Sequence, residues 1–128
     1  MSKGRVLVVD DEADVRKSVR LILTKAGYDV DEAEHPEAGV TLVKSGGNRQ
    51  PLNAIVTDLS MPTVNEIIVI PYLHSQFPSC PIVVLSGSKM LGRSTKLFKD
   101  AGVEFLAKPI NQEQLLGAVS KAVNKGGK

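Results

Sequence analysis

The chain has 128 residues, of which 42% are hydrophobic and 23% charged, and its formal net charge is +2. This length is typical of a single domain and is enough for a hydrophobic core without disulfide or metal crosslinks. The small net charge and the 4% aromatic content lack the basic, aromatic-rich character of nucleic-acid-binding surfaces, so we expect no direct contact with DNA or RNA.

The N-terminal residues and the cysteine content indicate the compartment. Met1 to Arg5 lead directly into an apolar run without a hydrophobic signal core, and no apolar run is long enough to span a bilayer. Cys80 is the single cysteine, so no internal disulfide can form, and no zinc-type spacing accompanies it. We therefore expect a cytoplasmic protein without membrane contact: one domain over residues 1–128, folded at about 4–125, with no output domain.

Apolar, β-branched runs alternate along the chain with segments of helical period, and this alternation predicts βα units with a parallel sheet. Pro36 suits the first turn of a helix, and Gly27 suits the position after one. Pro71 lacks a backbone donor, so the helix around it should start late or kink. In chain order we expect strands at 6–9, 28–33, 54–57, 82–85 and 105–107, and helices at 13–26, 36–45, 67–77 and 112–124, with a weaker helix from about residue 88.

Four of the apolar runs end on polar residues, namely Asp10 with Asp11, Asp58, Ser86 and Lys108. The carboxyl ends of parallel strands share one edge of the sheet, where open α/β folds bind ligands. Clustered carboxylates suit Mg²⁺, and two such charges about 4 Å apart repel by roughly 4 kcal/mol at an effective dielectric of 20. With a hydroxyl and an ammonium group added, the set matches phosphoryl transfer to a carboxylate nucleophile.

These residues resemble the receiver domain of two-component response regulators, whose single-domain members are CheY-like. The resemblance covers almost the whole chain and implies a doubly wound, flavodoxin-like α/β fold, with a five-stranded parallel sheet flanked by about five helices. Its carriers are Val8-Val9-Asp10-Asp11-Glu12, Thr57-Asp58-Leu59-Ser60-Met61-Pro62, Ser86-Gly87 and Ala107-Lys108-Pro109.

Carried over residue by residue, the resemblance implies that Asp58 is the phosphoacceptor. Asp11, Asp58 and the backbone carbonyl of Ser60 would bind Mg²⁺, and Asp10 would assist directly or through water. The domain would catalyse its own phosphoryl transfer and slow dephosphorylation, which is not conventional enzyme turnover. Its phosphodonor would be a sensor histidine kinase or a phosphotransfer protein.

The resemblance also implies a conformational switch. Ser86 would bind a phosphoryl oxygen and Lys108 would pair with the phosphoryl group. Phe105 occupies the position of the family's aromatic switch residue, which moves when Ser86 moves. The changed face, formed by the fourth helix, fifth strand and fifth helix, would contact an unknown downstream protein. We expect a monomer or a phosphorylation-dependent dimer.

Two departures from the family pattern keep an alternative open. Asn65-Glu66 stands where the family usually has an Asp-Gly pair, and Pro71 falls within the expected third helix. The alternative is a pseudo-receiver that binds its partner constitutively. A metal-dependent phosphatase is a distant third possibility, because Gly46-Gly47 lacks the context of a phosphate-binding loop. An isolated Asp-Asp pair would favour capping of the following helix, but the other three motifs outweigh that interpretation.

Overall fold

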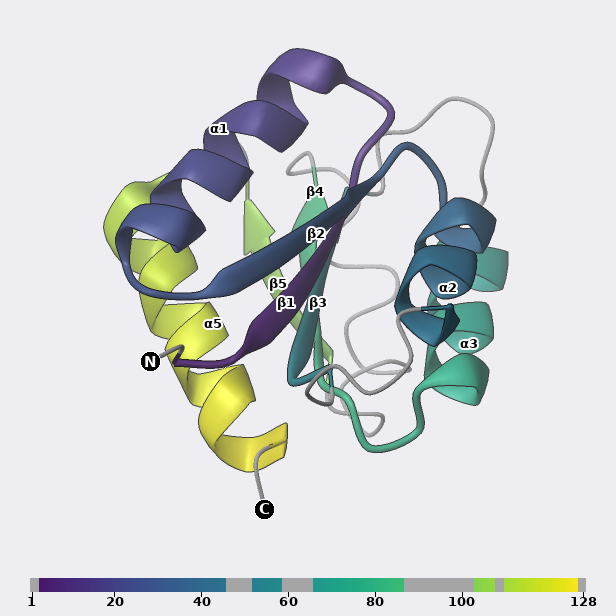
Figure 1. Cartoon of the computed structure of the whole chain (residues 1–128). Coiled ribbons are helices and arrows are strands. Elements are labelled where there is room, and N and C mark those ends of the chain that lie inside the picture. Colours follow the sequence, from purple (N-terminus) through teal and green to yellow (C-terminus); the bar gives the residue numbers. More distant parts are fainter. Residues whose placement is uncertain (1–2, 46–51, 59–65, 87–102, 108–109, 127–128) are drawn as a thin grey trace.

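A computed structural model of the chain describes residues 3–45, 52–58, 66–86, 103–107 and 110–126. Five parallel strands form one sheet in the order β2-β1-β3-β4-β5, with helices on both faces (Figure 1). This is the doubly wound, flavodoxin-like fold predicted from the sequence, and the helix expected from about residue 88 lies outside the described residues. The described elements are β1 (Arg5–Val9), α1 (Ala13–Lys25), β2 (Asp29–Ala33), α2 (Pro36–Lys44), β3 (Ala54–Asp58), α3 (Glu66–Gln76), β4 (Ile82–Ser86), β5 (Val103–Ala107) and α5 (Gln112–Gly126).

The sheet separates two apolar layers. Helices α1 and α5 cover one face, and α2 and α3 cover the other (Figure 1). Successive strand residues point to opposite faces, so Val6 and Val8 of β1 join the first layer while Leu7 and Val9 join the second. Both faces of β1, β3 and β4 are buried, which explains why these strands are continuous apolar runs instead of alternating ones.

The predicted signals at helix ends are confirmed for the first two helices. Gly27 follows α1 with a positive φ of 105°, which glycine adopts without steric cost. Pro36 is the first residue of α2, and His35 caps that helix by accepting the backbone N–H of Ala38 on Nδ1 at 3.3 Å. The bounds of the other elements differ from the predicted ones by one or two residues. The largest change at a helix end is in α5, which runs to Gly126 instead of residue 124.

Pro71, which was predicted either to delay or to kink the third helix, does not delay it. Helix α3 begins at Glu66, one residue before the predicted bound, and continues past Pro71. The proline removes one intrahelical hydrogen bond and costs about 3 kcal/mol in a helix interior. Ile70 and Leu73, which flank it, are 1% and 0% exposed, and full burial of such side chains contributes roughly 1.5–3 kcal/mol each. Packing against the sheet therefore outweighs the cost of the proline.

Two further features are the single cysteine and the character of the helices with respect to a membrane. Cys80 is a free thiol buried in the layer beneath α2 and α3, and burial raises its pKa to about 12. The thiol is therefore protonated at neutral pH and unreactive, as expected of a core residue. Among the described helices, none combines the length and the apolar character needed to cross a bilayer.

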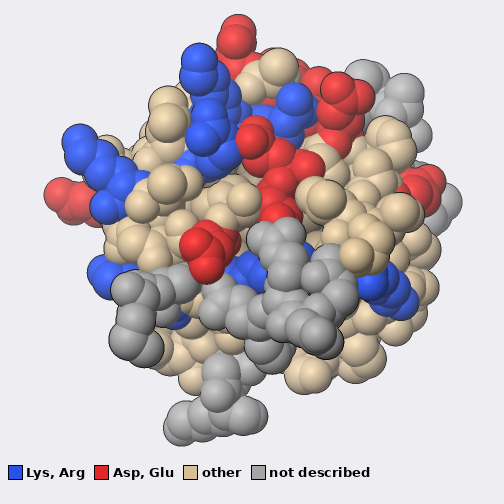
Figure 2. Space-filling model, viewed as in Figure 1, with Lys and Arg blue, Asp and Glu red and all other residues tan. Residues whose placement is uncertain are grey.

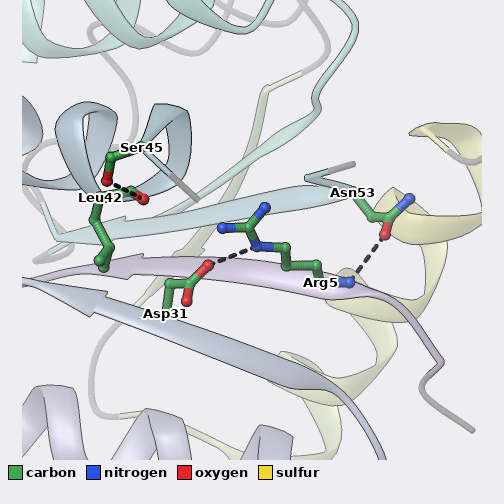
Figure 3. Close-up of polar contacts among 5 residues, drawn as sticks. All are labelled: Arg5, Asp31, Leu42, Ser45 and Asn53. Carbon is green, nitrogen blue, oxygen red and sulfur yellow. Dashed lines mark hydrogen bonds and ion pairs between the residues drawn. The ribbon is translucent and has the colours of Figure 1, made fainter. Parts of the chain in front are cut away.

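A buried ion pair joins the first two strands. Nε of Arg5 in β1 lies 2.6 Å from Oδ2 of Asp31 in β2, and the side chains are 3% and 7% exposed (Figure 3). The backbone N–H of Arg5 also donates to Oδ1 of Asn53, immediately before β3, at 2.9 Å. Taking either charge out of water alone would be costly, so each partner is needed by the other. The start of β1 is thereby tied to both neighbouring strands.

Replacement of one member of this pair should be far more damaging than replacement of both. We expect Arg5→Met to lower the free energy of unfolding by about 3 kcal/mol, because Asp31 is left as a buried charge without its guanidinium. The double variant Arg5→Met/Asp31→Leu should recover a large part of that loss. Urea denaturation of the two single variants and the double variant measures the coupling. Losses that simply add would contradict the coupling inferred from the ion pair.

Candidate functional site

The candidate site lies where β1 and β3 end side by side. Val9 of β1 pairs with Thr57 of β3, so Asp10 and Asp58 follow at the same level of adjacent strands. Each is only 1% exposed. The chain passes from β1 to β2 on one side and to β3 on the other, so this is the topological switch point at which doubly wound sheets bind ligands. In Figure 1 it is the upper end of the sheet, where α1 begins.

Three consecutive acidic residues form a cluster at this point. Carboxylate oxygens of Asp10, Asp11 and Glu12 lie within 4.8 Å of one another. Oδ1 of Asp10 accepts the backbone N–H of Glu12 at 2.9 Å, while Asp11 and Glu12 are exposed. The N-cap of α1 is Glu12, which makes no side-chain capping hydrogen bond. The two aspartates therefore do not act as the N-cap of this helix, which was the structural alternative for an Asp-Asp pair.

The donor set and its charge suit a divalent cation. All the clustered groups are hard carboxylate oxygens, the ligands that Mg²⁺ and Ca²⁺ take. Acidic atoms gather in the upper part of the space-filling view, with basic side chains beside them (Figure 2). Crowded carboxylates repel one another, and a bound cation would relieve that repulsion. The cluster thus fits the predicted metal. It contains the predicted ligands Asp10 and Asp11, and it adds Glu12, which was not predicted as a ligand. Asp58 is not part of this group and stands at the same level of the next strand.

The ends of β4 and β5, which carry the other predicted residues, lie along the same edge of the sheet. Asp58 pairs with Leu85 of β4, so Ser86 lies one residue beyond that pair. Ser86 in turn pairs with Ala107 at the end of β5. The four strands that end in the four motifs are consecutive neighbours in the sheet. The backbones of Ser86 and Phe105 belong to β4 and β5. Their side chains, Ser60 and Lys108 lie outside the described part of the structure.

The four sequence motifs do not include Arg16, a basic residue that contacts the acidic loop formed by Asp10, Asp11 and Glu12. Arg16 of α1 is 16% exposed, and its Nη1 donates to the backbone carbonyl of Asp10 at 2.7 Å. In the sequence it is one of several polar residues of an amphipathic helix, and no motif marks it. A hollow of about 430 Å³ beside the cluster is lined by Arg16, Glu32 and His35, among others, but not by Asp58.

The comparison with protein families decides the identity of this arrangement. The sequence profile described as the response regulator receiver domain matches residues 6–120. This range contains all the described strands except Arg5, the first residue of β1. The chain belongs to this family. The two-component receiver assignment made from the four motifs is thus confirmed.

Curated relatives of this receiver domain are longer proteins. The DNA-binding transcriptional regulator NtrC of Proteus hauseri is 23% identical over 123 residues, which are 96% of this chain and 25% of that protein. The cell cycle transcriptional regulator CtrA of Caulobacter vibrioides is 26% identical over 121 residues, 94% of this chain and 51% of CtrA. The chain spans between a quarter and half of the length of these two relatives.

Solved receiver structures share the fold along nearly their whole length. A response regulator receiver domain protein from Clostridium thermocellum superposes with a TM-score of 0.83 at 22% identity and covers 97% of both chains. The chemotaxis protein CheY4 of Vibrio cholerae superposes with a TM-score of 0.77 at 25% identity, covering 93% of this chain and 98% of CheY4. The receiver fold is therefore shown both by sequence and by structure.

Charge repulsion in the acidic cluster predicts an unusual stability change. Asp11→Asn, measured without divalent cations at low ionic strength, should raise the thermal midpoint by about 2 °C, because it removes one of three crowded carboxylates. Asp14→Asn is the matched control: Asp14 lies in the first turn of α1, where a negative charge is favourable, so its loss should lower the midpoint. An equal fall for both variants would contradict the repulsion.

Proposed function

We propose that this receiver domain accepts a phosphoryl group on Asp58 in a Mg²⁺-dependent reaction. The observation that carries the proposal is the position of Asp58, a buried carboxylate at the end of β3, in register beside the acidic cluster that follows β1. Receiver domains interact with histidine kinases or phosphotransfer proteins. The donor proposed here is accordingly a phosphohistidine of a sensor kinase or of a phosphotransfer protein.

In this reaction a carboxylate oxygen of Asp58 attacks phosphorus in line with the donor's nitrogen. The P–O bond forms as the P–N bond breaks, and the imidazole departs with the electron pair. A bound Mg²⁺ would supply charge neutralisation at the phosphoryl oxygens. The product is an acyl phosphate, which water hydrolyses to regenerate the aspartate. Burial at the sheet edge holds the Asp58 carboxylate in one place, which favours attack by proximity.

The remaining site residues have roles that follow from the family pattern. Asp11 and the backbone carbonyl of Ser60 would hold Mg²⁺ together with Asp58, and Asp10 would assist directly or through water. Ser86 would donate a hydrogen bond to a phosphoryl oxygen. Lys108 would pair with the same group as a point charge. The order of strands supports this set, since β1, β3, β4 and β5 are neighbours.

Phosphorylation would then switch a protein-binding face. It adds roughly two negative charges and three acceptor oxygens, enough to bias a two-state element. Ser86 and Phe105 would couple the phosphoryl group to the face near β5 and α5, which would bind an unknown downstream protein. We propose that the domain acts in the cytoplasm as a monomer or a phosphorylation-dependent dimer, without direct nucleic-acid or membrane contact.

Phosphorylation from a small donor tests the proposal. Incubation with acetyl phosphate and Mg²⁺ should add the mass of one phosphoryl group to the intact chain, and the adduct should be labile in base. Asp58→Asn should abolish it, because an amide cannot be the acceptor, and EDTA should abolish it in the wild type. Asp14→Asn is the matched control, since it removes an exposed acid of α1 outside the cluster.

The outcomes separate the two functional interpretations. An adduct that persists in Asp58→Asn would contradict Asp58 as the acceptor. Absence of an adduct together with absence of Mg²⁺ binding would favour the pseudo-receiver, which binds its partner constitutively. Binding of a partner that depends on phosphorylation would exclude that alternative.

A further inference from the structure

Among the described residues, Arg16 is a basic residue in direct contact with the acidic loop, and it has a second partner, Glu32. Its Nη1 donates to the backbone carbonyl of Asp10 at 2.7 Å, and its Nε lies 3.5 Å from Oε1 of Glu32. Its side chain is only 16% exposed. The planar, always charged guanidinium can make both contacts from one fixed orientation, which a flexible ammonium group cannot.

Glu32 contacts a second arginine as well. Nε of Arg20 lies 2.9 Å from the second oxygen of Glu32, so one carboxylate of β2 lies between two arginines on successive turns of α1. Arg20 and Glu32 are each about one-third exposed, so this pair is a surface contact. Arg20 is a close analogue of Arg16, with the same charge, the same helix and the same carboxylate partner. Arg16 also donates a hydrogen bond to the backbone carbonyl of Asp10 in the acidic loop.

The peptide groups on both sides of Asp10 are consequently anchored. Its backbone N–H donates to the carbonyl of Ala33 at the end of β2 at 3.1 Å, and its carbonyl accepts from Arg16. The Asp10 side chain accepts the N–H of Glu12. With both flanking peptide planes held, the backbone from which the clustered carboxylates project is oriented before any cation arrives. Such groups behind the ligands commonly alter metal affinity 10- to 100-fold when they are removed.

We propose that Arg16 is the positioning residue of the acidic loop and sets its affinity for Mg²⁺. This inference rests on the proposed Mg²⁺ site, and it makes a prediction opposite in sign to simple electrostatics. Removal of a positive charge near a cation site should tighten cation binding by Coulomb's law. Removal of a residue that positions the ligands should weaken it. The sign of the change in affinity therefore distinguishes the two effects.

The test is the dissociation constant of Mg²⁺, measured by amide chemical shifts well below the unfolding temperature of each variant. Arg16→Met should raise this constant about ten-fold. Arg20→Met should leave it unchanged or lower it, because it removes the same charge without touching Asp10. Arg16→Lys keeps both the charge and a donor, so a several-fold rise of the dissociation constant in this variant reports geometry alone. Arg16→Lys also replaces Arg16→Met as the test variant if Arg16→Met does not fold.

The possible results separate the positioning role of Arg16 from the Mg²⁺ site itself. Equal or tighter Mg²⁺ binding by both Arg16 variants, with normal binding by the wild type, would overturn the positioning role and leave the metal site intact. A wild-type chain whose acidic-loop amides do not respond to Mg²⁺ would overturn the metal site and this role together. Weaker binding by Arg20→Met to the same degree as by Arg16→Met would assign the effect to the loss of the Glu32 contact and contradict the carbonyl contact as its cause.

Discussion

The register between β1 and β3 determines where the charges of the candidate site lie. Because Val9 pairs with Thr57, the carboxylates of Asp10 and Asp58 emerge at the same level of adjacent strands. A shift by one residue would turn every side chain of a strand to the opposite face. Both faces of β1 and β3 are buried, so such a shift would exchange side chains between the two core layers and disturb their packing. The hydrophobic core and the acidic site are thus products of one pairing.

The three consecutive acids that follow β1 crowd negative charge at this edge of the sheet. Because Asp11 and Glu12 are exposed, water screens part of their repulsion. The described structure offsets some of this charge locally, through the N–H of Glu12 at Asp10 and through the guanidinium of Arg16. A divalent cation would offset more.

Local features of the sequence predicted the elements that local chemistry determines. The apolar runs predicted the strands, Gly27 and Pro36 predicted two helix ends, and the acids that follow the runs predicted the candidate site. Features that depend on distant residues were not predictable. The pairs Arg5–Asp31 and Arg16–Asp10 form only after β1, β2 and α1 have packed together. The start of α3 at Glu66 despite Pro71 has the same origin, because burial of Ile70 and Leu73 outweighs the local preference.

The most direct measurement identifies the phosphorylated atom. Borohydride reduces an acyl phosphate to an alcohol and would convert a phosphorylated aspartate into homoserine, which peptide mass analysis can locate after treatment with acetyl phosphate and Mg²⁺. We expect the conversion at Asp58 alone. Conversion at Asp10 or Asp11, at the neighbouring strand end, would contradict it, because those carboxylates are assigned to the cation and Asp58 to phosphorus.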